Sequence, residues 1–353
     1  MRTVCLFTAS VLATAVVAAD TCKALVMSGG GSNGSWEAGV MWGMLNYGNP
    51  SDFEWDVVTG VSAGSINTIY TAGYKVGDEA NMAQNLSDLW KNLHSSDVWK
   101  DWTLGKVWGA TAKQGAVDNS PLLAYLTNLL SAFTEGYGRR VSLGSVNANT
   151  GVYTEFTQKN TEFMDLAQAS VSSASIPFVF PPHVWEGKGV FMDGGTVYNV
   201  DLEGAIAQCM DLVDDESKII IDIYFCGAPK SAETEEKVGN SWENYFRGRS
   251  LRKYYGDSNS IALAMVGHPT VQMRHMVNQA VGAMSGTSEL NFEGDFTWAA
   301  QLQGRTDAQT SLAGNGSYDV KAAFNEWIAD EMVREDYPQV GDFLLAKQSP
   351  QPL

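Results

Sequence analysis

Short apolar runs along the chain alternate with segments of helical periodicity. Residues 23–27 form an apolar run that enters a glycine-rich turn, and helical spacing follows at about 35–46. The run at 55–59 repeats this arrangement, with a helical pattern that starts at Ser65. Strand, turn and helix in succession are typical of an α/β fold with parallel strands. We therefore expect a mostly parallel central sheet in the first half of the chain.

The alternation continues to about residue 225, and from about Ser241 the chain is mostly helical. Three prolines within 176–182 predict an extended segment there, because a residue before proline avoids helical geometry. A hairpin is expected around 187–189, and 271–277 has the pattern of a helix interior. The other expected helices are 79–94, 121–133, 161–173 and 202–212, and the other expected strands are 140–146, 152–158, 190–193 and 218–225.

Length and composition fit one large globular unit. The chain has 353 residues, of which 44% are hydrophobic, and it contains no internal repeat or low-complexity tract. We expect a main domain over 20–240 and, within the same globule, a mostly helical C-terminal extension over 241–353. The formal net charge of −17 argues against nucleic acid and strongly anionic membranes as partners.

The first 19 residues have the pattern of a secretory signal peptide. Arg2 gives a basic start, 4–17 form an apolar stretch, and small residues precede a cut before Asp20. No later segment is long and apolar enough to cross a bilayer. We expect a mature chain without a transmembrane segment, secreted or held in the lumen of the secretory pathway.

Ser62 lies in the motif GVSAG, where an apolar strand meets a helix. G-x-S-x-G at such a junction is typical of a nucleophile elbow, in which a strained turn projects the serine oxygen from the sheet edge. The flanking residues Gly60 and Gly64 let strand and helix pass closely. Ser62 is therefore the candidate nucleophile.

The run GGGSNG also follows a strand and opens a helix, so its backbone N–H groups point outward beside the positive end of the helix dipole. One use of this geometry is an oxyanion hole for acyl transfer. The other is dinucleotide binding, for which an acidic residue stands near the ribose-binding spacing. The glycines concerned are Gly29, Gly30, Gly31 and Gly34, and the acidic residues are Asp52, Glu54 and Asp56.

A serine nucleophile needs a base. Asp193 ends an apolar strand and precedes Gly194 and Gly195, which places a carboxylate on a tight turn. A Ser–His–Asp triad of the α/β-hydrolase type would add His268 or His275, since the histidine follows the acid in that order. Neither histidine lies in a suggestive loop, so the residues alone leave the triad open.

Taken together, the three motifs GGGSNG, GVSAG and DGG resemble the patatin-like phospholipase family, which has them in this order. The segments 117–126 and 169–182 also resemble that family, so the resemblance covers about 23–212. It implies a three-layer α/β fold, no metal or other cofactor, and a lipid or phospholipid acyl ester as substrate. A storage or binding protein of the same type, with feeble activity, is the alternative from another class.

The resemblance also implies roles for the residues. Asp193 would take the proton of Ser62 directly, and the loop of Gly29 to Gly34 would hold the oxyanion. Family members commonly carry Arg or Lys where this chain has Asn33. We therefore expect no cationic contact near the substrate from this loop.

Two further features carry expectations. Trp99, Trp102 and Trp108 lie in a stretch of little periodicity, so they either pack in the core or form a flap that enters a membrane or micelle interface. The cysteines of the mature chain are Cys22, Cys209 and Cys226. Cys22 starts a strand and Cys209 ends a crossover helix, so both lie at one end of the sheet. If a disulfide forms, we expect Cys22–Cys209.

Overall fold

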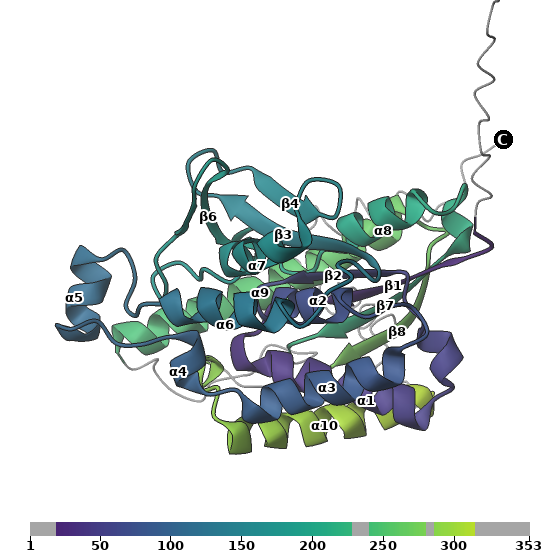
Figure 1. Cartoon of the computed structure of the whole chain (residues 1–353), viewed down its shortest axis with the longest axis horizontal. Helices are drawn as coiled ribbons and strands as arrows, with labels where there is room; N and C mark the ends of the chain where they lie inside the picture. Colours follow the sequence, from purple (N-terminus) through teal and green to yellow (C-terminus); the bar gives the residue numbers. More distant parts are fainter. Residues whose placement is uncertain (1–18, 228–239, 280–285, 315–353) are drawn as a thin grey trace, which may run out of the picture.

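An eight-stranded sheet lies at the centre of the computed structural model (Figure 1). The structure describes residues 19–227, 240–279 and 286–314. In this part of the chain the strand order is β5-β6-β3-β2-β1-β7-β8, and β4 pairs with β3 outside this path. The strands are β1 (Cys22–Met27), β2 (Val57–Val61), β3 (Arg140–Asn147), β4 (Tyr153–Thr157), β5 (His183–Trp185), β6 (Gly189–Asp193), β7 (Ile219–Phe225) and β8 (Gln272–Asn278).

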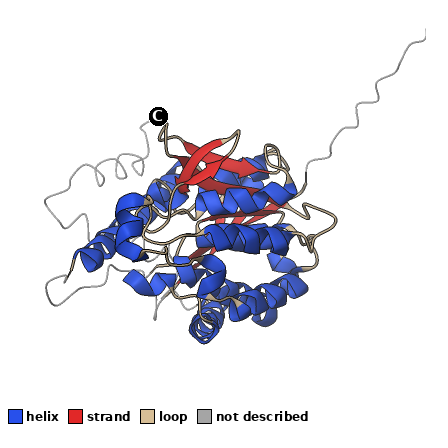
Figure 2. Cartoon of the chain, turned by 60° about the vertical axis from the view of Figure 1, so that its left-hand side comes forward, coloured by secondary structure: helices blue, strands red, loops and turns tan. Residues whose placement is uncertain are grey.

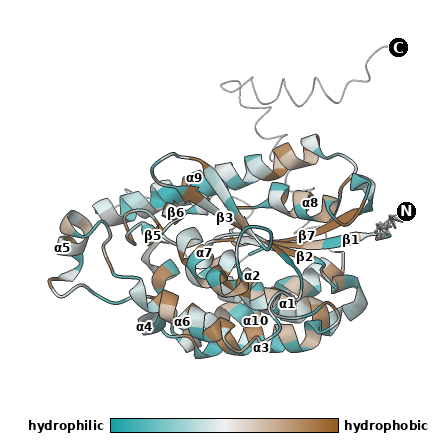
Figure 3. Ribbon diagram, turned by 45° about the horizontal axis from the view of Figure 1, so that its top comes forward, coloured by the Kyte–Doolittle hydropathy of each residue, from teal (hydrophilic) through white to brown (hydrophobic). Residues whose placement is uncertain are grey.

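The sheet is mostly parallel, as expected from the sequence. Strands β3, β2, β1, β7 and β8 run parallel, whereas β4, β5 and β6 join antiparallel on the side of β3. Every residue of β2 is buried, and residues of mostly hydrophobic character line the central strands (Figure 3). A strand buried on both faces requires helices on both faces, which Figure 2 shows.

The alternation of side chains along β1 divides the core into two layers. Cys22, Ala24 and Val26 contact the layer that contains α8 and α9, whereas Leu25 and Met27 contact the layer of α1, α2 and α3. The helices are α1 (Gly34–Tyr47), α2 (Ala63–Ala72), α3 (Glu79–Asn92), α4 (Ser95–Val98), α5 (Gly105–Ala112), α6 (Ser120–Leu130), α7 (Leu166–Ser173), α8 (Leu202–Met210), α9 (Ser241–Gly267) and α10 (Gly294–Leu312).

The residues after 240 belong to the same globule. Strand β8 extends the sheet beyond β7, and α10 packs along α1 (Figure 1). The two helices approach closely because Gly39 leaves no side chain between them: a Cβ atom there would come within 2.2 Å of the Gln301 carbonyl oxygen. The Trp36 indole donates to Asp307 Oδ2 across the same interface at 2.8 Å.

Two expectations about this fold are wrong. The pattern at 271–277 suggested a helix, but β8 occupies Gln272–Asn278. A short apolar run does not distinguish a strand from a helix, and here the backbone pairs with the open edge of β7. The segment 176–182 is not extended throughout: the Phe180 N–H donates to the Ile176 carbonyl at 2.9 Å, and Phe178 has φ of 73°. A proline restricts the residue before it but favours the second position of a turn, where Pro177 lies.

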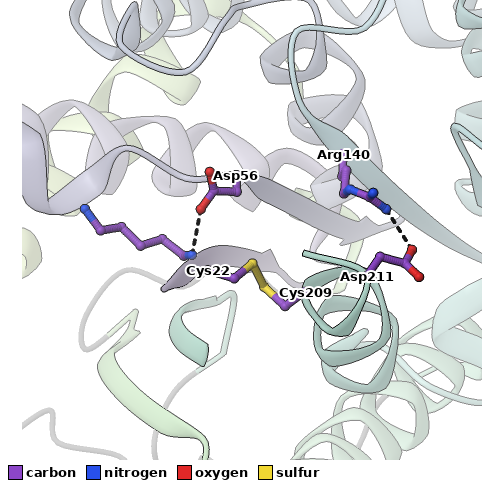
Figure 4. Close-up of a disulfide and its surroundings, with 6 residues drawn as sticks. Cys22, Asp56, Arg140, Cys209 and Asp211 are labelled. Atoms are coloured by element: carbon purple, nitrogen blue, oxygen red, sulfur yellow. Dashed lines mark hydrogen bonds and ion pairs between the residues drawn. A yellow bond between two sulfur atoms is a disulfide. The ribbon is translucent and has the colours of Figure 1, made fainter. Parts of the chain in front are cut away.

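The expected cysteine pairing is confirmed. Cys22 and Cys209 form a disulfide with 5.6 Å between their Cα atoms, and Cys226 is a buried free thiol. Figure 4 shows the bridge joining the start of β1 to α8, at the end of the sheet where Asp56 accepts from the backbone N–H of Lys23. The direction of the chain therefore identified the correct pair. The predicted signal segment, except its last residue, lies outside the described residues, as do 315–353 of the predicted extension.

Candidate active site

Ser62 occupies the turn between β2 and α2. Its φ of 54° is unusual for a residue with a side chain and is the strained geometry expected of a nucleophile elbow. The two glycines are required by close approach, since a Cβ atom at Gly60 would come within 2.2 Å of the Gly64 carbonyl oxygen, and one at Gly64 within 2.3 Å of that of Met27. The Ser62 N–H donates to Ser173 Oγ at 2.9 Å, which fixes the turn from α7.

The glycine-rich loop lies directly beside this serine. A Cβ atom at Gly29 would come within 2.9 Å of the Cβ of Ser62. The Gly29 N–H donates to the Asn199 carbonyl, whereas Gly30 and Gly31 donate no backbone hydrogen bond to another described residue. Gly34 begins α1, so the loop lies at the positive end of that helix. Backbone donors next to a serine side chain are the arrangement that an oxyanion hole requires.

Asp193 ends β6 and is buried next to the same serine. Its Oδ1 accepts from the Gly195 N–H at 2.7 Å, and its buried Oδ2 makes no hydrogen bond to a described residue. The strand pairing puts Asp193 opposite Ser145 of β3. Gly194 packs against that strand without a side chain, because a Cβ atom there would come within 2.4 Å of the Gly144 carbonyl oxygen. The structure therefore brings together all three motifs that the sequence singled out.

Burial dominates the electrostatics of Asp193. It raises the pKa of the carboxyl, although the Arg249 charge, the nearby Ser62 hydroxyl and the Gly195 N–H each lower that pKa. The Ser62 hydroxyl is thus close to the carboxyl without pointing at Oδ2 in hydrogen-bonding geometry. Active-site hydrogen bonds often tighten only when substrate is bound. A carboxylate with a raised pKa is a stronger base than an ordinary aspartate.

Helix α9 supplies cations that the motifs did not predict. Tyr245, Arg249, Lys253 and Asp257 are spaced four residues apart and so share one face of the helix. Arg249 pairs with Glu289, and Lys253 donates to the Cys226 carbonyl. Glu289 in turn lies against the oxyanion loop, since a Cβ atom at Gly31 would come within 2.4 Å of its carbonyl oxygen.

The expectation from Asn33 holds only for the loop itself. The Asn33 side chain donates to the Gly30 carbonyl at 2.9 Å and braces the loop, and the cation comes from Arg249 instead. The sequence carried a signal for this contribution: residues 247–253 hold four Arg and Lys in a chain of strongly negative net charge. This cluster lies beyond the three motifs, so they do not connect it with the site.

A second buried carboxylate lies behind the loop. Glu37 of α1 accepts from the Asn67 side chain at 2.9 Å, and Asn67 also donates to the Gly34 carbonyl. Burial raises the pKa of Glu37 to about 8, although hydrogen bonds to Cys226 and Asn67 lower it. Cys226 Sγ contacts the Asn33 carbonyl at 3.4 Å. These groups pack against the glycine-rich loop and stabilise it. No motif in the sequence predicted them.

The two histidines considered for a triad make their contacts away from Ser62 and Asp193. His268 pairs with Glu203 and Glu216, and His275 contacts Ser311 Oγ at 3.1 Å. In residues 19–227, 240–279 and 286–314, no histidine hydrogen-bonds to Ser62 or Asp193. The geometry therefore favours a pair of catalytic groups over a triad.

The positions of the acidic residues contradict the interpretation of the glycine-rich loop as a dinucleotide-binding site. Asp56 and the two acidic residues before it precede β2, whereas the glycine loop follows β1. Because the two strands are parallel, acids and loop lie at opposite ends of the sheet, separated by about 16 Å for a five-residue strand. In the described part of the chain, no group of His, Cys, Asp and Glu side chains is arranged to hold a metal ion.

Comparison with known proteins agrees with this geometry. A family model described as patatin-like phospholipase matches residues 25–206. The chain belongs to this family. It is therefore a lipid acyl hydrolase with the mixed α/β fold of that family.

Two solved structures resemble the chain at low identity. VipD from Legionella pneumophila matches with 14% identity and a TM-score of 0.41, over 84% of this chain and 67% of its own. A chain of the heterodimeric ExoU–SpcU complex of Pseudomonas aeruginosa matches with 13% identity and a TM-score of 0.28, over 70% of this chain and 57% of its own. A search of curated proteins found no match.

Proposed function

We propose that Ser62 and Asp193 form the catalytic dyad of this lipid acyl hydrolase. The observation that carries the proposal is the junction at Ser62: a strained serine turn with the glycine loop on one side and a buried carboxylate on the other. Ser62 and Asp193 are each only 3% exposed, so a low dielectric strengthens every charge interaction between them.

The chemistry follows from these positions. Asp193 removes the proton from Ser62 Oγ as this oxygen attacks the ester carbonyl of the lipid. The N–H groups of Gly30 and Gly31 donate to the oxyanion of the tetrahedral intermediate. Asp193 then returns the proton to the leaving alcohol. A water molecule, deprotonated by Asp193, attacks the acyl-enzyme, and collapse of the second intermediate releases the fatty acid and regenerates Ser62.

We further propose that the protein is exported and acts at a lipid–water interface. The predicted signal segment supports export, and the Cys22–Cys209 disulfide fits an oxidising compartment. Helix α5 stands away from the rest of the molecule (Figure 1); its Val107 is 79% exposed, and Leu104, which directly precedes the helix, is 67% exposed. Exposed apolar side chains on a projecting helix suit contact with a lipid surface. No helix in the described ranges is both long and apolar enough to span a membrane.

The dyad is tested by four single substitutions. Ser62→Ala and Asp193→Asn should each lower turnover of a lipid ester by at least about 1,000-fold, because each removes half of the proton-transfer pair. His268→Ala and His275→Ala should stay within a few-fold of wild type. Circular dichroism checks that each variant is folded.

If a folded histidine variant loses several orders of magnitude in ester turnover, the site is a triad and the proposed dyad is wrong. Labelling with a fluorophosphonate, followed by peptide mapping, should modify Ser62 in the wild type and nothing in Ser62→Ala. An absence of both labelling and ester turnover in the wild type would favour the storage or binding protein.

A further inference from the structure

A mostly apolar pocket lies between the start of α9 and the segment that leads into α5. Its volume is about 540 Å³, within the usual range for small-molecule sites. Trp99, Val117, Val179 and Leu290 supply apolar lining, and Glu243 of α9 is among the polar lining residues. The motifs and the dyad do not account for this pocket.

Two segments that line the pocket also contact the candidate catalytic site. Val179 closes the turn that follows Ser175, whose carbonyl accepts from the Asp193 N–H at 2.9 Å. Leu290 is the neighbour of Glu289, which packs on Gly31 of the oxyanion loop. The pocket wall and the oxyanion loop are therefore parts of one continuous structure.

Helix α9 is a further element shared by the pocket and the surroundings of Asp193. The Tyr245 hydroxyl donates to the Pro177 carbonyl at 2.6 Å, two residues from Val179. One helical turn further, about 6 Å along the axis, Arg249 lies close enough to Asp193 to lower its pKa. Helix α9 therefore contributes both to the pocket, through Glu243, and to the surroundings of Asp193, through Arg249.

Two charged side chains, Lys106 and Glu243, also line the pocket. The Lys106 ammonium lies over the Trp99 ring at 5.0 Å from its centroid, and Trp99 Nε1 donates to the Leu290 carbonyl at 3.1 Å. The indole N–H is thus satisfied, and its ring remains for apolar contact. Leu104 and Val107, whose side chains are exposed, flank the pocket residue Lys106 in the sequence.

We propose that this pocket binds the hydrocarbon chain of the substrate's acyl group. The proposal rests on the proposed function, since it places the ester at Ser62. Its lining, its size and its continuity with the oxyanion loop favour a flexible apolar chain over a polar ligand. A pocket of this kind discriminates by chain length, because each methylene added to an apolar site contributes to binding.

Chain-length preference provides the test. Leu290 is half-buried, so Leu290→Trp fills the pocket with little cost to the core, and Leu290→Ala enlarges it. Leu302→Trp makes the same substitution at a site on α10 that is 47% exposed, and serves as the matched control. For each variant, kcat/KM is measured with p-nitrophenyl butyrate and p-nitrophenyl dodecanoate.

Leu290→Trp should lower the dodecanoate-to-butyrate ratio by about tenfold. Leu290→Ala should leave that ratio unchanged or raise it, and Leu302→Trp should leave it unchanged. An unchanged ratio in both folded Leu290 variants would overturn the pocket assignment while leaving the dyad intact. Equal loss with both esters would also overturn it, since the residue would then affect catalysis rather than chain binding.

A binding measurement separates the pocket from the proposed function. Dodecanoate is titrated into Ser62→Ala by isothermal calorimetry, with and without Leu290→Trp. Binding that is lost with Leu290→Trp and kept with Leu302→Trp supports the pocket even if no ester is hydrolysed. Dodecanoate binding that is absent from Ser62→Ala, or unaffected by Leu290→Trp, overturns it.

Discussion

Asp193 shows how burial alone can prepare a carboxyl group for base catalysis. An exposed aspartate has a pKa of about 3.9 and accepts a proton weakly near neutral pH. Burial raises the pKa of Asp193, and the guanidinium of Arg249 opposes this effect. Burial therefore dominates the pKa of the proposed base, and a helix that lies outside the family motifs moderates it.

The pH dependence of turnover should report this balance. The proposed base must be ionised, so activity falls as the pH decreases through the pKa of Asp193, and burial places this acid limb at higher pH than an exposed aspartate would give. Arg249→Gln removes a charge that lowers this pKa, so the acid limb of kcat/KM should move to higher pH. Arg247→Gln, on the same helix but outside that interaction, should leave the limb in place. A limb that moves to lower pH in Arg249→Gln would contradict this assignment.

Among the structural elements, the sequence predicted those features that nearby residues or the direction of the chain decide. It did not predict the features that depend on tertiary packing. The elbow at Ser62 was predictable because strand, glycine and helix fix its geometry within a few residues. The Cys22–Cys209 pair was predictable because chain direction in a parallel sheet decides which ends meet. Strand β8 was not, because its partner β7 is distant in sequence. The contribution of Arg249 also depends on tertiary packing, which no local pattern reports.

Helix α5 carries a separate prediction. Replacing Leu104 and Val107 together by Ser should weaken binding to phosphatidylcholine vesicles by about tenfold or more, because each side chain buried in lipid contributes about 1–2 kcal/mol. Hydrolysis of dissolved butyrate ester should not change. Val184→Ser, at a position on β5 that is 70% exposed, is the control. Vesicle binding is measured by sedimentation. Equal binding by all variants would show that α5 does not contact the lipid surface.

For the whole molecule, several buried carboxyl groups link stability to pH. Burial raises the pKa of Glu37 to about 8, and those of Asp201 and Asp257 to about 7. In the unfolded chain these groups have pKa values of about 4. The folded state therefore binds more protons between these limits, and the stabilisation present below pH 4 is lost as the pH rises through 7 to 8.

We expect the free energy of unfolding in urea to fall between pH 5 and pH 8. Glu37→Gln, which keeps an acceptor for Asn67, should flatten this slope, whereas Glu162→Gln at the exposed surface should not. Unfolding curves at several pH values measure both effects. A slope that is the same in wild type and Glu37→Gln would mean that Glu37 is ionised in the folded state.

The buried Cys226 thiol can report on local unfolding of the protein. With Cys22 and Cys209 bonded to each other, it is the free thiol among the described residues, and a Cβ atom at Gly30 would come within 2.5 Å of its Cβ. A maleimide can reach this sulfur only when the packing under the oxyanion loop separates. The labelling rate at increasing urea therefore measures how often that region opens, and whether it opens before the rest of the protein unfolds.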